Sequence, residues 1–508
     1  MSPSPPPPAA APDSPAGRRV IVGPFNRVEG DLEVRLTVAQ GMVAAAEVNA
    51  TMFRGFESML VGRHPMDALT IVPRICGICS VSQSIAAARA LADAAGIAPP
   101  PNGQRMHNLM IACENLADHL THFYLFFMPD FARACYAHRP WHAEARKRYA
   151  ALAEPEPGAR SVAATAARAR WFELMGLMGG RWPHTGSLVP SGSTRAVTAS
   201  ERLRLWAKLR EMRGFLESHT FGAPLETVAA LSDATALLAW ADGDARRAQS
   251  DLALWLEIAQ DLTLERLGRG AKQLMSYGAF AAPSGFGFSS GLFDLATQAV
   301  TPIPLSAITE DARSAWFDSA TGPLHPSVGS TVPAPDKPGA YTWNKAPRLD
   351  GQVLEVGALA RQAVDGHPLA RALLQDGPAT VFSRVVARLL ETARILPLME
   401  RWVGALELGA PFAKPLPTFG RAHGVGLAEA ARGALGHWLS IEDGRISHYQ
   451  IIAPTSWNFS PRDSQGSPGA LESALVGTPV DERASDDAHV AVQHVVRSFD
   501  PCMVCTVH

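Results

Sequence analysis

Hydrophobic residues recur along much of this chain at the three- and four-residue spacing of an amphipathic helix. The clearest pattern lies in residues 103–128, whose apolar positions include Leu109, Cys113, Leu116, Leu120, Phe123 and Phe127. Similar patterns predict further helices over residues 82–95, 200–219, 242–268 and 380–404. Long helices with little strand predict a mainly α fold, with a large helical body and small peripheral β-sheets.

A different period appears near the N-terminus. Residues 32–38, LEVRLTV, alternate apolar and polar side chains, which is typical of a half-buried strand. Gln40-Gly41 is a turn signal, and residues 42–49 can return as the second strand. The sequence therefore predicts an N-terminal β-hairpin within about residues 20–50.

Composition predicts one large folded domain with a short tail. Of the 508 residues, 47% are hydrophobic and 19% charged, which is enough for a sizeable core. Residues 1–18 are rich in Pro and Ala and lack the basic and apolar regions of a signal peptide, so we expect a disordered tail before a single domain at 19–508. No run of eighteen apolar residues predicts a membrane span, and the net charge of −2 argues against a nucleic-acid-binding surface.

Four of the six cysteines lie in two Cys-x-x-Cys motifs at opposite ends of the chain. Cys76 and Cys79 form the first motif, and Cys502 and Cys505 form the second in a C-terminal ligand segment at 498–508. Four thiolates suit a soft metal such as Zn, Fe, Cu(I) or Ni. Cys113 and Cys135 are expected to be small buried hydrophobes, and this cysteine usage favours a reducing compartment and hence a cytoplasmic protein.

Spacing alone leaves three kinds of site open. A structural zinc site usually keeps both cysteine pairs on one stretch, with about 12–20 residues between them, unlike the present arrangement. A redox disulfide motif and a less common metal centre are the other two possibilities. The residues around the cysteines decide among the three.

Both motif contexts resemble the ligand motifs of the large subunit of nickel-iron hydrogenases. The first reads Arg-Ile-Cys-Gly-Ile-Cys at 74–79 and the second Asp-Pro-Cys-Met-Val-Cys-Thr-Val-His at 500–508. The resemblance runs from about residue 20 to the last residue. It implies that all four cysteines bind nickel, and that Cys79 and Cys505 also bridge to an iron carrying carbon monoxide and cyanide.

The resemblance also implies a proton relay. Taken alone, Glu29 is typical of a solvated turn carboxylate, but Arg-Val-Glu-Gly at 27–30 is similar to the family segment whose glutamate relays protons to and from a nickel-bound cysteine. A carboxyl in a mostly apolar pocket has its pKa raised toward neutrality, as a relay near neutral pH requires.

A magnesium site is implied by three further positions. Glu57 alone would be a surface carboxylate at a helix start, and the family has a magnesium ligand here. His508 matches the C-terminal histidine ligand, and the backbone carbonyl of Ile451 matches the third ligand. Oxygen ligands suit this hard cation, whereas a histidine nitrogen is an uncommon magnesium ligand.

An arginine over the metal pair is the last element of the resemblance. Asp118 lies in the stretch Asp-His-x-x-His-Phe-Tyr at 118–124, and the family's matching aspartate orients that arginine. Arg432 is the candidate arginine, and Asp500 belongs to the same group. The family usually has proline before this arginine, whereas this chain has Ala431, whose backbone is less restricted. Without the resemblance, a surface arginine is an equally good interpretation of Arg432.

Two departures favour the regulatory, hydrogen-sensing branch of the family. Catalytic members normally have histidine four residues after the second cysteine, where this chain has Gln83. Glutamine can still hydrogen-bond a cysteine sulfur but has no group that becomes cationic. Energy-conserving members are usually made with an extension after the histidine that matches His508, and an extension that was never encoded is expected of the sensing branch.

These features together predict the large subunit of a regulatory nickel-iron hydrogenase of low turnover. It would cleave H2 and pass electrons to iron-sulfur clusters in a small subunit, since this chain has no spare cysteines to hold them. A histidine kinase and metal-centre maturation proteins are the other expected partners. The alternatives are an energy-conserving uptake hydrogenase, a structural quinone-module subunit that has lost its nickel ligands, and a zinc-stabilised interaction protein. The four cysteines argue against the quinone-module subunit.

Overall fold

The computed structural model describes residues 17–282, 285–480, 489–506 and 508. The expected disordered tail falls outside this range except for its last two residues, and Arg18 already belongs to a strand. The longer helices are α3 (Ser80–Ala94), α4 (Pro101–Thr121), α5 (His142–Tyr149), α6 (Ala159–Trp171), α7 (Glu173–Gly179), α8 (Ala199–Phe215), α10 (Ala234–Ala241), α12 (Asp251–Asp261), α13 (Ala358–Val364), α15 (Val381–Gly404) and α18 (Val490–Ser498). The mainly α fold expected from the sequence is confirmed.

Shorter elements connect and flank these helices. The short helices are α1 (Phe56–Leu60), α2 (Ala68–Ile71), α9 (Leu225–Ala229), α11 (Asp244–Gln249), α14 (Pro368–Ala372), α16 (Pro454–Asn458), α17 (Ala470–Leu475) and α19 (Met503–Thr506). The strands are β1 (Arg18–Val22), β2 (Leu32–Ala39), β3 (Met42–Ala50), β4 (Leu188–Val189), β5 (Gly192–Ser193), β6 (Gln273–Ser276), β7 (Ala279–Ala282), β8 (Gly285–Phe288), β9 (Gly291–Asp294), β10 (Ala299–Thr301), β11 (Ile308–Asp311), β12 (Ala346–Leu349), β13 (Leu354–Val356), β14 (Ala422–Ala430), β15 (Gly433–Glu442) and β16 (Arg445–Ile452).

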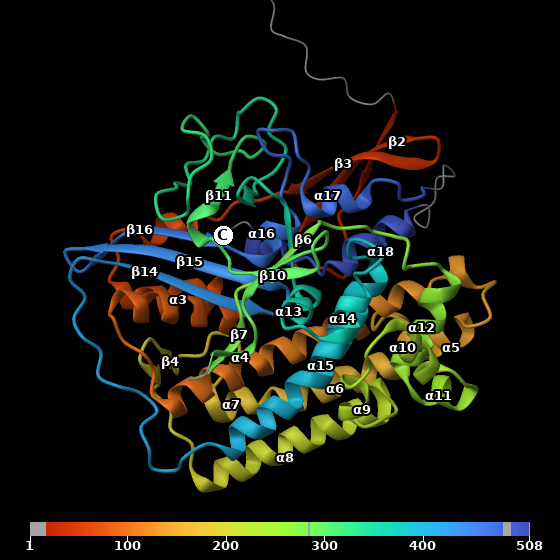
Figure 1. Ribbon diagram of the computed structural model, residues 1–508, viewed down its shortest axis with the longest axis horizontal. Coiled ribbons are helices and arrows are strands. Elements are labelled where there is room, and N and C mark those ends of the chain that lie inside the picture. Colours follow the sequence, from red (N-terminus) through yellow and green to blue (C-terminus); the bar gives the residue numbers. More distant parts are fainter. Residues whose placement is uncertain (1–16, 283–284, 481–488, 507) are drawn as a thin grey trace, which may run out of the picture.

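Helix α4 is the centre of the helical body. Nearly all of its side chains are buried, because α3, α6, α7 and α15 pack around it (Figure 1). Such a helix carries apolar groups on every face, as expected when no face meets water. Beyond Thr121 the chain widens into one π-type turn, His122–Phe127, so the regular α-helix ends earlier than the predicted residue 128. Single π turns often mark functional sites.

The N-terminal strands form an antiparallel sheet in the order β1-β2-β3. Leu32 pairs with Ala50 and Ala39 with Met42, so β2 and β3 are joined by the two-residue turn Gln40-Gly41. Both turn residues have positive φ, 53° and 72°, as type I′ hairpins require, and the glycine adopts this conformation without strain. Alternate β2 residues are buried, in agreement with the period of the sequence.

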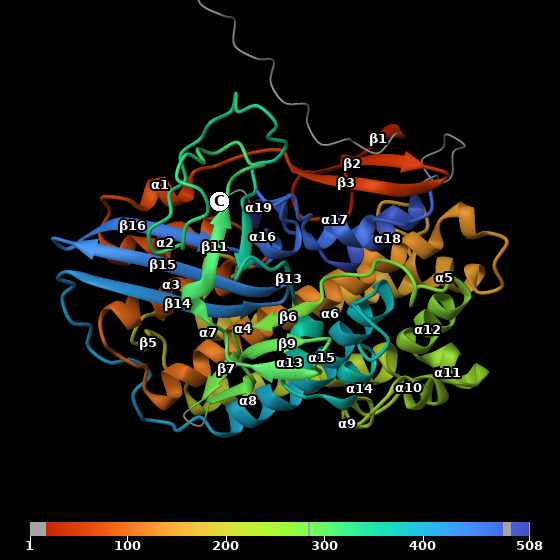
Figure 2. The same ribbon diagram turned by 45° about the horizontal axis from the view of Figure 1, so that its top comes forward.

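A second antiparallel sheet, β14-β15-β16, was not predicted from the sequence. It packs directly on α3, and the two views in Figures 1 and 2 show its strands beside this helix. Gly426 allows the close approach, since a Cβ atom there would lie 1.9 Å from the carbonyl oxygen of Ala86. The two-residue loop between β14 and β15 contains Arg432, so this sheet positions one of the candidate site residues.

One predicted helix is divided in two. Residues 242–268 were expected to be continuous, whereas the structure has α11 and α12 with Ser250 between them. The Ser250 hydroxyl accepts a hydrogen bond from the amide of Ala253 and so caps α12. Hydrophobic spacing alone predicts one continuous helix here, because it does not detect the cap at Ser250.

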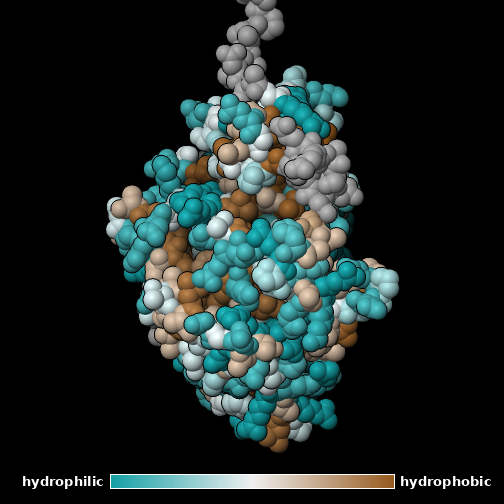
Figure 3. Space-filling view, turned by 90° about the vertical axis from the view of Figure 1, so that its right-hand side faces the viewer, coloured by the Kyte–Doolittle hydropathy of each residue, from teal (hydrophilic) through white to brown (hydrophobic). Residues whose placement is uncertain are grey.

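The C-terminal end of the described chain is buried, whereas its first residues, Gly17 to Arg19, are exposed. The C-terminus lies beside α16 and the end of the β14-β15-β16 sheet (Figure 2). The face in Figure 3 is largely hydrophilic, and apolar residues gather around its middle. Within the described residues, no helix combines the length and apolar character that a membrane span needs.

Candidate metal centre

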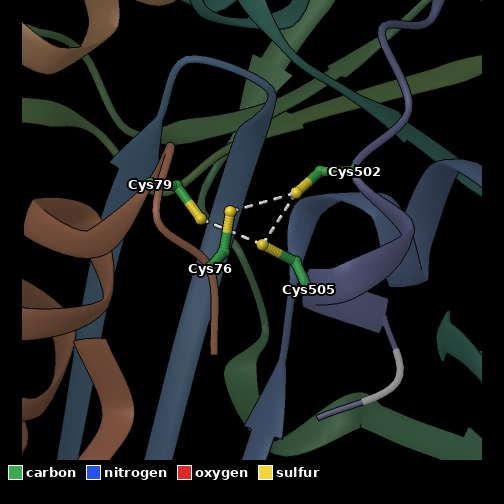
Figure 4. Close-up of side chains that lie close together, drawn as sticks. All are labelled: Cys76, Cys79, Cys502 and Cys505. Carbon is green, nitrogen blue, oxygen red and sulfur yellow. Dashed lines mark hydrogen bonds between the residues drawn. The ribbon is translucent and has the colours of Figure 1, made fainter. Parts of the chain in front are cut away.

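The four motif cysteines meet in one buried cluster. Their ligand atoms all lie within 4.8 Å of one another. Figure 4 shows the sulfurs converging from two separate segments. Sγ of Cys79 lies 2.9 Å from Sγ of Cys505, and Sγ of Cys76 lies 3.4 Å from Sγ of Cys502. None of the six cysteines forms a disulfide.

Local structure brings each pair into place. Cys79 directly precedes α3, Cys502 directly precedes α19, and Cys505 lies within α19. Glu29 ties the two ends of the chain together, since its amide donates to the carbonyl of Pro501 at 3.3 Å and its carbonyl accepts from Met503 at 2.7 Å. The second motif is therefore held by the segment that carries the predicted relay glutamate.

The cluster has the chemistry of a soft-metal site. All four cysteines are at most 8% exposed, and burial raises the pKa of the Cys502 and Cys505 thiols. Hydrogen bonds from the other three cysteines instead lower the pKa of the Cys76 thiol. A metal ion would stabilise all four as thiolates. The donor set therefore fits a nickel centre, and by itself would fit zinc equally well.

Glu29 lies at the edge of this cluster, half-buried and paired by backbone bridge to Cys502. Burial raises the pKa of its carboxyl, and the negative charge of Cys76 raises it further, while Arg432 opposes the shift. A carboxyl with a raised pKa next to a metal-binding cysteine has the properties that the predicted relay needs.

Arg432 is bound by both predicted carboxylates. Its guanidinium donates to Oδ2 of Asp118, to Oδ1 of Asp500 at 3.0 Å and to the Asp500 carbonyl at 2.9 Å. All three residues are at most 4% exposed. Oδ1 of Asp118 and Oδ2 of Asp500 have no hydrogen-bond partner among the described residues. Buried polar atoms left without a partner usually face water or a ligand.

The electrostatics of this group are uneven. Burial raises the pKa of Asp118 to about 7, against the lowering effect of Arg432. For Asp500, burial is the largest single effect and raises the pKa, but Arg432, His122, Arg388 and His119 together outweigh it and lower the pKa. The two carboxylates compensate the buried guanidinium, which would be costly to bury alone. The backbone of Asp500 has φ of 58°, a left-handed conformation that aspartate tolerates better than most residues.

The three predicted magnesium ligands also meet. Oε1 of Glu57 accepts from the Ile451 amide at 2.8 Å and lies 3.2 Å from Nε2 of His508. The contact to Ile451 joins its amide rather than the expected carbonyl. Burial alone would raise the pKa of Glu57, but Lys345 and His508 lower it to about 2, so a hard carboxylate is present here.

Gln83 is buried one turn after Cys79 but makes a different contact from the expected one. Its Oε1 lies 2.9 Å from Nε2 of His437. No hydrogen bond to a cysteine sulfur is present, and its Nε2 has no partner among the described residues. The expected bond to sulfur is therefore absent from the described contacts, although a donor remains free to make it.

Three supporting residues were missed by sequence reasoning. Arg54 donates to the carbonyl of Ile75 at 2.6 Å and to that of Val504, and so links the two cysteine motifs. The buried carboxylate of Glu114 accepts from the amides of Val81 and Ser82, both at 2.8 Å, and caps α3 from a neighbouring helix. His437 contacts Gln83 from the unpredicted sheet. Of the three, only Arg54 could have been found from the sequence, because it lies three residues before the predicted magnesium ligand Glu57.

Comparison with known proteins distinguishes nickel from zinc. The family model described as nickel-dependent hydrogenase matches residues 54–157 and 250–508. The chain is 31% identical to the periplasmic NiFeSe hydrogenase large subunit of Desulfomicrobium baculatum, over 98% of this chain and 96% of that protein. It is 28% identical to the uptake hydrogenase large subunit of Rhodobacter capsulatus, over 97% of this chain and 95% of that protein.

The fold agrees with the sequence comparison. The solved structure of the Ni-Fe-Se hydrogenase from D. vulgaris Hildenborough in the reduced state matches with a TM-score of 0.80 at 30% identity. The match covers 97% of this chain and 100% of that chain. The two cysteine pairs, remote in the sequence, form one buried cluster, and the chain matches these proteins over nearly its whole length. The chain therefore belongs to the nickel-dependent hydrogenase family, whose members are oxidoreductases acting on H2.

Proposed function

We propose that this chain is the catalytic large subunit of a nickel-iron hydrogenase that oxidises H2 for energy conservation, as an uptake enzyme does. The four-cysteine cluster carries the proposal, because it offers every thiolate that such a centre needs. The relatives named above support turnover rather than sensing, since they include an uptake hydrogenase and a periplasmic enzyme. This replaces the regulatory role, which the sequence alone favoured, as the leading hypothesis.

Cys76, Cys79, Cys502 and Cys505 would hold the nickel. Cys79 and Cys505 would also bridge to an iron that carries carbon monoxide and cyanide, and their sulfurs face each other at 2.9 Å. When bound, the metal pair supplies the heterolytic cleavage of H2, which yields two protons and two electrons in all. The protein residues position the gas, exclude water and move the protons.

Glu29 would take the proton from a cysteine that has become protonated to a thiol, and pass it outward. Replacing it in Glu29→Gln keeps the size of the side chain but removes the titrating group. We expect the steady-state rate of H2 oxidation to fall by about 100-fold or more, the usual effect of losing a general acid–base group. Dye reduction under H2 measures the rate, and metal analysis should give an unchanged nickel content.

The matched control is Asp31→Asn, which neutralises an exposed carboxylate two residues further along. It should keep the rate of the unaltered enzyme. If Glu29→Gln also keeps that rate, protons leave the centre by another route and the relay assignment is wrong.

Glu57, the Ile451 carbonyl and His508 would bind a magnesium ion next to the centre. The low pKa of Glu57 supports this assignment because the carboxylate stays ionised at neutral pH. A magnesium ion would also compensate the negative charge that two adjacent acidic groups, Glu57 and Glu310, bring into one buried region. The amide of Ile451 rather than its carbonyl now faces Glu57, so the third ligand rests on the resemblance alone.

The electrons require a partner subunit. Of the two cysteines outside the cluster, Cys113 is buried in α4, and two cysteines are too few for an iron-sulfur cluster held by four. We therefore propose an iron-sulfur small subunit as the partner, and maturation proteins that insert the metal centre. The expected cytoplasmic location stays a prediction, and one relative is a periplasmic protein.

A hydrogen sensor that signals to a histidine kinase is the second candidate, and Gln83 is the observation that favours it. Steady-state H2 oxidation by the purified complex with an artificial dye separates the two. An uptake enzyme should turn over within the common enzyme range of about 1–1,000 s⁻¹. A complex with full nickel content and a rate far below that range would favour the sensor.

A further inference from the structure

In the side-chain amide of Gln83, the oxygen has a hydrogen-bond partner and the nitrogen has none among the described residues. Gln83 is fully buried, and its Oε1 lies 2.9 Å from Nε2 of His437. Its Nε2 has no partner among the described residues. A buried amide nitrogen is rarely left without an acceptor, so this donor points to a group that the protein binds or creates.

Two residues of the β14-β15-β16 sheet hold the other end. His437 on β15 is fully buried, and its Nδ1 lies 2.8 Å from the hydroxyl of Tyr449 on β16. An amide oxygen only accepts, so Nε2 of His437 must carry the proton in this contact. In the neutral ring Nδ1 then accepts from the Tyr449 hydroxyl.

The helix places the free donor on the same face as a metal ligand. Gln83 lies in the first turn of α3, four residues after Cys79, and its backbone amide donates to the Cys79 carbonyl at 3.1 Å. Side chains four residues apart lie on the same face of a helix. A thiolate on Cys79 would accept a hydrogen bond from Nε2, whereas the amide oxygen turned the same way would repel it.

We propose that His437 and Tyr449 are positioning residues, which keep the Gln83 amide turned so that its Nε2 donates to the Cys79 thiolate. This rests on the proposed function, because Cys79 is a thiolate once the metal pair is bound. The chain of bonds runs from the Tyr449 hydroxyl to His437, from His437 to the Gln83 carbonyl oxygen, and from the Gln83 amide to sulfur. The Tyr449 hydroxyl has no other hydrogen-bond partner among the described residues, so its proton is placed in a hydrogen bond when it donates to His437.

Loss of the Tyr449 hydroxyl would remove the donor that fixes the direction of these hydrogen bonds. In Tyr449→Phe, the proton of His437 is free to occupy Nδ1, so Nε2 becomes an acceptor and the Gln83 amide turns over to donate to it. Its oxygen then faces the Cys79 sulfur. Without the donor, the sulfur gives more electron density to the iron, and back-donation weakens the bonds of carbon monoxide and cyanide.

Infrared spectra of the purified nickel-loaded complex test this inference. The bands of the iron ligands should move to lower wavenumber in Tyr449→Phe and in Gln83→Leu, with nickel content unchanged. The matched control is Tyr277→Phe, because Tyr277 is a buried tyrosine whose hydroxyl has no partner among the described residues. Its bands should stay at the positions of the unaltered complex.

The outcomes are distinct. Unmoved bands in Gln83→Leu overturn the hydrogen bond to sulfur, and unmoved bands in Tyr449→Phe alone overturn the positioning role. Loss of nickel from Tyr449→Phe would mean that the residue is structural. An unaltered complex without nickel or ligand bands would instead remove the proposed function, and this inference with it.

Discussion

Replacing Cys502 with serine is expected to abolish nickel binding and H2 oxidation together. A serine hydroxyl has a far higher pKa than a thiol and is a harder ligand, so the site would keep only three thiolates. The loss of nickel affinity and activity should exceed the roughly 10–100-fold loss that is typical when a residue hydrogen-bonded to a metal ligand is replaced. Metal analysis and dye reduction on the purified complex measure the two quantities.

Cys135→Ser is the control for this change, because Cys135 lies outside the cluster. It should bind nickel and oxidise H2 like the unaltered complex. Retained nickel and activity in Cys502→Ser would show that the fourth sulfur is not a ligand. The serine variants of Cys76, Cys79 and Cys505 are likewise expected to lose nickel and H2 oxidation.

Replacing Arg432 with lysine is expected to lower the rate of H2 oxidation by about 100-fold, a common cost of losing a preorganised polar group at a reacting centre. The planar guanidinium binds Asp118 and both the carboxylate and the carbonyl of Asp500. The ammonium group of lysine is a single point charge and does not reproduce this fork. Because the positive charge remains, the buried carboxylates stay compensated and the nickel content should not change.

Arg421→Lys provides the comparison on the surface, since the Arg421 side chain is 80% exposed and pairs with Glu442. It should leave the rate unchanged, because exposed ion pairs contribute little. If Arg432→Lys reaches the unaltered rate, positive charge alone suffices and the shape of the guanidinium plays no part.

The candidate site was largely predictable because its chemistry depends on rare residues in fixed order. Cys76 and Cys505 belong to short motifs that retain their spacing whatever the rest of the chain does. Arg432 and Asp118 were identified by neighbouring residues, and the structure brings them into contact. Their catalytic roles stay predictions until the variants are measured.

The sheet behind the site was not predictable from hydrophobic period. Nine of the ten residues of β15 are buried, so the strand shows no alternation of apolar and polar positions. β14, AHGVGLAEA, is built mainly from alanine and glycine, which are poor strand formers. Tertiary packing on α3 rather than local preference makes this segment a strand, and His437 was missed for the same reason.

Metal analysis of the purified complex, combined with infrared spectroscopy, tests the central claim most directly. The account predicts about one nickel per chain and one iron bearing diatomic ligands, with bands where protein does not absorb. Zinc in place of nickel, with no such bands, would contradict it.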